Sequence, residues 1–191
     1  MSEISLVPNH LFDCTIDFPP ACDNNNTLTF FTKACIGERT EIMEGNLYYN
    51  SFVDVLSARN LIKKRIILKM DIEGGEYDAF KYFPLEYLDY IDQIVIEVHF
   101  DMYGPEYWGN LDIFRSILDK FYNINFHFNN HGCYNLFYDP EDVKLRGLPA
   151  HAFEATLINK KLVKLNSPSR TYKEHPLNTP NKAVIPDCQM L

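Results

Sequence analysis

Three carboxylates stand directly after an apolar stretch of the chain, in the segment ILKMDIEGGEYDAF from Ile67 to Phe80. They are Asp71, Glu73 and Glu76, and the pair Gly74-Gly75 separates the second from the third. Acids at the end of a buried strand need hydrogen-bond partners or a bound ligand, because removing an unpaired carboxylate from water costs free energy. Acids at such a position can orient a nucleophile, exchange a proton or bind a cation. This segment is therefore the first candidate for chemistry.

A second apolar segment, QIVIEVHF (Gln93 to Phe100), carries Glu97 and His99. Residues i and i+2 of a strand point to the same side, so Asp71 and Glu73 share one side, as do Glu97 and His99. If the two strands are neighbours, these four titratable groups converge on one rim of the sheet. In open α/β sheets ligands bind at that rim, beyond the carboxyl ends of the strands.

Structural roles compete with chemistry at several of these positions. Glu76 falls in the first turn of an expected helix, where the helix dipole favours an acid, and we favour that role for it. Glu97 and His99 could simply pair with each other. Asp71 stands at the end of an apolar strand, which favours a functional role.

Hydrophobic periodicity predicts the elements that position these residues. RIILKMDI (65–72) is nearly continuous in apolar residues, as in strands covered on both faces of a parallel sheet. A helix is expected over Glu76 to Phe83, ended by Pro84, and QIVIEVHF supplies the next strand. Strand, helix and strand in so short a space form a βαβ unit, which requires parallel pairing. Upstream, SFVDVLSARNLI predicts a short helix with Ser51 as its N-cap and Phe52, Val55, Leu56 and Leu61 as its buried stripe.

The rest of the chain predicts short strands and one further helix. HLFDCTI (10–16) and LTFFTKACIG (28–37) are expected strands, and a helical stripe follows the loop DMYGPEYWGN. INFHF and YNLFY could form a hairpin across NNHG, in which His127 and His131 would be structural or exposed. FEATLINKKLVKL, Phe153 to Leu165, predicts a final hairpin with its turn near Asn159-Lys160. One α/β domain over residues 1–165 and an extended arm over 166–191 are therefore expected.

Composition and charge exclude several classes of protein. The 191 residues are 46% hydrophobic, typical of a folded domain, and the net charge of −8 argues against nucleic acid as a partner. The sequence has neither an apolar run of membrane-spanning length nor the features of a signal peptide at its start, so a cytoplasmic location is expected for the chain as written. The five cysteines lack zinc-ligand spacing, which favours free thiols, although Cys14 and Cys22 could pair in a secreted protein.

At these residues the chain resembles the FkbM-like class I methyltransferases, including their eukaryotic methyltransferase-like branch. The strand-end signature LKMDIEGGEYDAF carries the resemblance, with IDQIVIEVHF behind it and SFVDVL ahead of it. HLFDCT and LTFFTKACIG are similar to the second and third strands of that family. The resemblance covers roughly residues 9–165.

The resemblance implies a Rossmann-like sheet, mostly parallel with an antiparallel C-terminal hairpin, and S-adenosylmethionine as cofactor for methyl transfer to oxygen. It implies that Asp13 accepts hydrogen bonds from the ribose and that Asp71 lies beside the sulfonium and the acceptor. From their positions, we place Glu73, Glu97 and His99 on the acceptor side. His99 is the best candidate for a general base there, because the unperturbed pKa of imidazole is near 6.5. The acceptor class, a small molecule or a glycan, stays open.

The chain departs from the family in one respect that leaves other functions open. The segment MSEISLVPNHLF before Asp13 contains no glycine, whereas the family has its first strand and a glycine-rich cofactor turn there. The expected sheet is therefore N-terminally incomplete. An inactive methyltransferase-like fragment that acts as an interaction module is one alternative. A metal-dependent hydrolase, with Asp71, Glu73, Glu97 and His99 around a hard divalent cation, is another.

Overall fold

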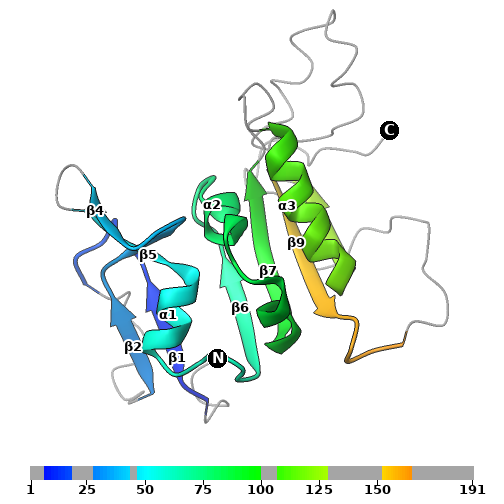
Figure 1. The fold of residues 1–191 in the computed structure, drawn as a ribbon, viewed down its shortest axis with the longest axis horizontal. Coiled ribbons are helices and arrows are strands. Elements are labelled where there is room, and N and C mark those ends of the chain that lie inside the picture. Colours follow the sequence, from blue (N-terminus) through cyan, green and yellow to red (C-terminus); the bar gives the residue numbers. More distant parts are fainter. Residues whose placement is uncertain (1–6, 19–27, 44–46, 100–106, 129–151, 165–191) are drawn as a thin grey trace, which may run out of the picture.

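The computed structural model describes residues 7–18, 28–43, 47–99, 107–128 and 152–164, which form three small sheets and a few short helices (Figure 1). The strands are β1 (Asn9–Phe12), β2 (Thr29–Thr32), β3 (Cys35–Gly37), β4 (Glu41–Met43), β5 (Leu47–Ser51), β6 (Ile66–Met70), β7 (Ile91–His99), β8 (Phe121–Phe128) and β9 (Ala152–Asn159). The helices are α1 (Phe52–Ala58), α2 (Glu76–Lys81), the 3-10 helix η1 (Leu85–Tyr90) and α3 (Tyr107–Lys120). Among these described helices, none is long and apolar enough to cross a lipid bilayer.

The largest sheet has the strand order β6-β7-β9-β8. Its strands β6 and β7 run parallel, whereas β9 is antiparallel to both of its neighbours. A second sheet pairs β1 with β2 in parallel, and a third has the order β3-β5-β4. The fold is thus a mixed α/β arrangement in which the main sheet is mostly antiparallel.

The predicted Rossmann-like fold is wrong. The described residues form three separate sheets rather than one mostly parallel sheet, and only α1 and α3 among their helices reach seven residues. Parallel neighbours need a crossover of about a dozen residues or more, usually a helix. The segment after β3 forms the antiparallel strand β4 instead, and β9 inserts antiparallel beside β7. The sequence contains one clear βαβ unit, and it was the family resemblance that extended a parallel sheet to the whole chain.

That βαβ unit itself is confirmed. β6 pairs with β7 in parallel with Met70 opposite Ile96, and α2 lies between them in the chain. In Figure 1 the arrows of β6 and β7 point toward the same edge, and α2 lies near that edge. Phe80 of α2 and Phe83 after it pack against Phe52 of α1, with ring centroids 5.8 and 4.9 Å from that ring.

The N-cap of α1 is also as predicted. The Ser51 hydroxyl accepts a hydrogen bond from the Asp54 backbone N–H at 3.1 Å, and Phe52, Val55 and Leu56 are buried. The helix ends at Ala58, so Leu61 packs against the core from the turn that follows rather than from the helix.

The expected C-terminal hairpin is wrong. β9 is a single strand that ends at Asn159 and is covered on both edges, by β7 and by β8. Asn159 is 3% exposed, and its side-chain amide donates to the carbonyls of Leu88 and Ile91 at 3.1 and 2.9 Å. The central position of β9 stabilises it more than a local hairpin partner would, because both rows of its backbone groups are paired. YNLFY, His131 and the arm over 166–191 lie outside the described residues.

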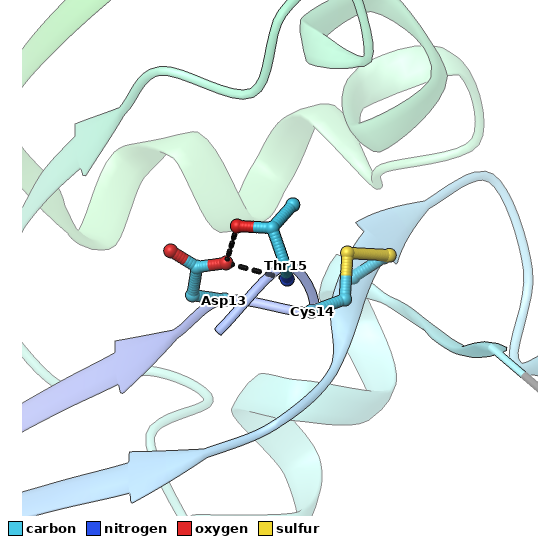
Figure 2. Close-up of a disulfide and its surroundings, with 4 residues drawn as sticks. Asp13, Cys14 and Thr15 are labelled. Atoms are coloured by element: carbon cyan, nitrogen blue, oxygen red, sulfur yellow. Dashed lines mark hydrogen bonds between the residues drawn. A yellow bond between two sulfur atoms is a disulfide. The ribbon is translucent and has the colours of Figure 1, made fainter. Parts of the chain in front are cut away.

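Two cysteines form a disulfide that the sequence did not predict. Cys14 follows β1 closely and bonds to Cys35, the first residue of β3, with 4.8 Å between the Cα atoms (Figure 2). The expectation of free thiols is therefore wrong for this pair, and Cys14 pairs with Cys35 rather than with Cys22. Disulfide partners must have adjacent Cα atoms, which only the folded chain reveals.

Candidate functional site at the ends of β6 and β7

His99, the last residue of β7, lies close to carboxylates from its own strand, from α2 and from the turn between β6 and α2. Its Nδ1 atom lies 3.2 Å from Oε1 of Glu76. Its Nε2 atom lies 3.5 Å from Oε2 of Glu73 and 3.7 Å from Oε1 of Glu97. The side chain of His99 is 24% exposed, so solvent reaches part of the ring. The structure thus brings His99 together with Glu73 and Glu97, two of the three acids that the sequence placed on its rim.

Glu76 is the most deeply buried acid of the group, with a side chain 2% exposed. Its Oε1 atom accepts from the backbone N–H of Ile72 at 3.0 Å and of Gly74 at 3.3 Å, and its Oε2 atom accepts from Gly74 at 3.1 Å. Together with the contact to His99, these bonds give the buried carboxylate the partners that burial requires. Our interpretation of Glu76 as a helix-start acid therefore missed its main role, although it does stand in the first turn of α2.

The turn between β6 and α2 makes this arrangement possible. Glu73 and Gly74 both have positive φ angles, 54° and 99°, so the chain reverses tightly between Asp71 and Glu76. Glycine adopts such angles readily, and this explains why a glycine occupies position 74. The reversal brings the backbone N–H groups of Ile72 and Gly74 to the carboxylate of Glu76 and leaves Glu73 89% exposed at the rim.

These contacts shift the pKa values of His99 and Glu76 in opposite directions. The Glu76 carboxylate raises the pKa of His99 above its ordinary 6.5, against the opposing effect of burial, and the charges of Glu97 and Glu73 add to the rise. Burial alone would raise the pKa of Glu76, but the bonds from His99 and from the Ile72 N–H outweigh it, and the net pKa is lowered. At neutral pH the pair is therefore a buried carboxylate beside a readily protonated imidazole.

Asp71 completes the rim and adds a potential metal ligand. One ligand atom each of Asp71, Glu73 and His99 lie within 4.8 Å of one another. Oxygen and imidazole nitrogen ligands suit divalent cations such as Mn²⁺ and Zn²⁺. The Lys69 ammonium lies 3.6 Å from Oδ2 of Asp71 and balances part of its charge.

Asp13, the acid expected to bind ribose, belongs to a different part of the fold. It follows β1, and its Oδ1 atom accepts from the Thr15 backbone N–H at 2.7 Å and from the Thr15 hydroxyl at 2.6 Å (Figure 2). The Thr15 hydroxyl and then its N–H lower the pKa of Asp13. Among the described residues Asp13 makes no hydrogen bond or ion pair with Asp71 or His99.

A second His–Glu pair lies on the strands beyond β7, and the sequence analysis missed its glutamate. Glu154 of β9 stands directly opposite Glu97 in the antiparallel register, and His127 of β8 stands opposite Glu154. His127 is 2% exposed and its Nδ1 atom lies 3.2 Å from Oε2 of Glu154. A lone glutamate between apolar residues of a strand was the available signal, since Glu97 had been recognised in the same way.

Comparison of the chain with protein-family models, with curated proteins and with solved structures finds no match. The function of the rim must therefore be argued from its own chemistry.

Proposed function

We propose that this chain carries the acceptor-activating site of an S-adenosylmethionine-dependent O-methyltransferase, with His99 as its general base. The observation that carries the proposal is the position of His99 at the rim, with Nδ1 beside buried Glu76 and Nε2 toward Glu73 and Glu97. The resemblance of the segment from Leu68 to Phe80 to a methyltransferase signature supports the same reaction class. The proposal does not rely on a Rossmann-like sheet, because the described residues do not form one.

The charges of the rim suit the cofactor. When bound, S-adenosylmethionine supplies an electrophilic methyl group on a sulfonium cation and leaves as S-adenosylhomocysteine. Asp71, Glu73 and Glu97 gather negative charge around one imidazole, which favours a cation at this place. In the proposed arrangement Asp71 orients the acceptor hydroxyl.

His99 takes the proton of the acceptor hydroxyl at Nε2, so that the oxygen attacks as an incipient alkoxide. The neighbouring carboxylates of Glu73 and Glu97 then stabilise the imidazolium that forms. Because the Glu76 contact raises the pKa of His99, the basic form of the ring becomes abundant only above pH 6.5. We therefore expect the acid limb of the pH–rate profile to lie above that value.

Calorimetric titration with S-adenosylhomocysteine tests the proposal. We expect saturable one-site binding by the wild-type chain and at least tenfold weaker binding by Asp71→Asn. Asp92→Asn is the matched control, since Asp92 lies near the opposite end of β7, beside Arg65, and the substitution removes the same charge. No heat at protein concentrations well above micromolar would overturn the proposal and favour an interaction module without cofactor.

A second candidate function is divalent-cation-dependent hydrolysis, and it is favoured by the convergence of Asp71, Glu73 and His99 within 4.8 Å. A cation held there would lower the pKa of a bound water and supply a hydroxide nucleophile. Electron paramagnetic resonance of added Mn²⁺ separates the two candidates. Stoichiometric Mn²⁺ binding that is lost in Asp71→Asn and His99→Asn but kept in Asp92→Asn, without binding of S-adenosylhomocysteine, would support hydrolysis instead of methyl transfer.

A further inference from the structure

We propose that Glu76 is a positioning residue that holds the neutral ring of His99 as the Nδ1–H tautomer and so presents the lone pair of Nε2 at the rim. Its consequence for methyl transfer rests on the proposed function. The tautomer itself does not, because a general base and a cation ligand both need an unprotonated Nε2.

The first argument is the chemistry of the contact. An ionised carboxylate can only accept hydrogen bonds, so the ring nitrogen 3.2 Å from Oε1 of Glu76 must be the one that keeps its hydrogen. The other carboxylates lie farther from the ring, at 3.5 and 3.7 Å from Nε2, outside the usual N–H···O range. Of the two ring nitrogens, Nδ1 therefore has the better acceptor.

The second argument is the difference in burial between the competing acids. Glu76 is 2% exposed, whereas Glu73, the nearest acid to Nε2, is 89% exposed. Hydrogen bonds to a charged group are stronger in the low dielectric of the interior than in solvent. The pull of Glu76 on the ring proton thus exceeds that of Glu73.

The third argument is that Oε1 of Glu76 contacts the chain at the ends of both β6 and β7. Oε1 of Glu76 accepts from the N–H of Ile72, which follows β6, and contacts His99 at the end of β7. Two N–H groups of the turn, at Ile72 and Gly74, donate to this same carboxylate. Because four contacts hold this carboxylate, it can orient the ring with little freedom.

Substitutions separate the hydrogen bond from the charge of Glu76. In Glu76→Gln the side-chain amide oxygen can still accept from Ile72 and from Nδ1–H, although the charge is gone. In Glu76→Leu the acceptor is lost. A bond to a charged acceptor biases a tautomer ratio by roughly ten- to hundredfold, so the loss should be easy to detect.

Long-range ¹H–¹⁵N correlation spectra of the free protein report the tautomer directly, at a pH where the ring is neutral. Among the six histidines, His99 is assigned by its loss in His99→Asn. We expect the Nδ1–H form in the wild type and in Glu76→Gln, and a ratio of Nδ1–H to Nε2–H at least tenfold lower in Glu76→Leu. Glu154→Gln, which changes the other His–Glu pair, should leave the His99 tautomer unchanged.

An Nε2–H ring in the wild type, or an unchanged ratio in Glu76→Leu, would overturn the proposal. If Glu76→Leu does not fold, Glu76→Asp takes its place, since it withdraws the carboxylate by one methylene and should lower the same ratio. The measurement needs no cofactor, so an Nδ1–H ring in a chain that does not bind S-adenosylhomocysteine would refute only the proposed function.

Discussion

The burial of Glu76 predicts a large loss of stability when its carboxylate is removed. Glu76→Leu leaves three donors without their acceptor: the backbone N–H groups of Ile72 and Gly74, and Nδ1 of His99. Each partly buried donor that loses its partner costs about 1 kcal/mol, the lower end of the usual range, because solvent reaches this turn in part. His99 can release its proton, so it adds no further cost of an unpaired buried charge. We therefore expect a loss of about 3 kcal/mol.

Urea unfolding at pH 7 measures this loss. With a slope of about 2 kcal/mol/M, the unfolding midpoint should fall by about 1.5 M in Glu76→Leu. Glu76→Gln keeps an oxygen acceptor for Ile72 and should lose only about 1 kcal/mol. The matched control is Glu86→Leu, the same change at an exposed acid in the first turn of η1, for which we expect a change within about 0.5 kcal/mol. If Glu76→Leu were as stable as Glu86→Leu, Glu76 would be no more than a helix-start acid.

Four further predictions concern the disulfide, the end of β9 and the dependence of stability on pH. The disulfide between Cys14 and Cys35 joins residues 21 positions apart, so its removal by paired serine substitution should cost about 3 kcal/mol in the same urea assay; an unchanged midpoint would contradict this. Asn159→Ala removes the donor to two buried carbonyls and should lower stability by about 2–4 kcal/mol, measured by thermal unfolding, whereas a loss below 1 kcal/mol would mean that water replaces the amide. Folding raises the pKa of His99 above 6.5. The contribution of His99 to the free energy of unfolding is therefore fully present below pH 6.5, and it is lost as the pH rises through the pKa of the folded state. The stability difference between wild type and His99→Gln should therefore shrink between pH 6 and pH 9, and a difference that grows would show the opposite sign of the pKa shift. At the acid end, the contribution of Glu76 should disappear as the pH falls below 4.5 and through its lowered pKa.

The sequence was sufficient to predict the features that depend on local residue patterns. The N-cap of α1 at Ser51 follows from a hydroxyl placed just before an apolar stripe. The parallel pairing of β6 and β7 follows from two apolar runs joined by a helix of the right length. The meeting of Asp71, Glu73, Glu97 and His99 at one rim was expected from that pairing. The alternation of side chains along a strand accounts for Glu97 and His99 only, because Asp71 and Glu73 lie after the end of β6.

Other features depended on contacts between distant segments, and only the tertiary structure decided them. β9 was expected in a local hairpin but lies between β7 and β8, since Phe153, Ala155 and Leu157 are buried in the centre of the sheet. The pairing of Cys14 with Cys35 required two sheets to approach each other. The role of Glu76 is the clearest case: its position in the first turn of α2 is visible in the sequence, but its burial depends on a tight reversal at Glu73 and Gly74 and on a ring from β7. Periodicity reports which side of an element is apolar, whereas the partner of a buried charge is set by how the elements pack.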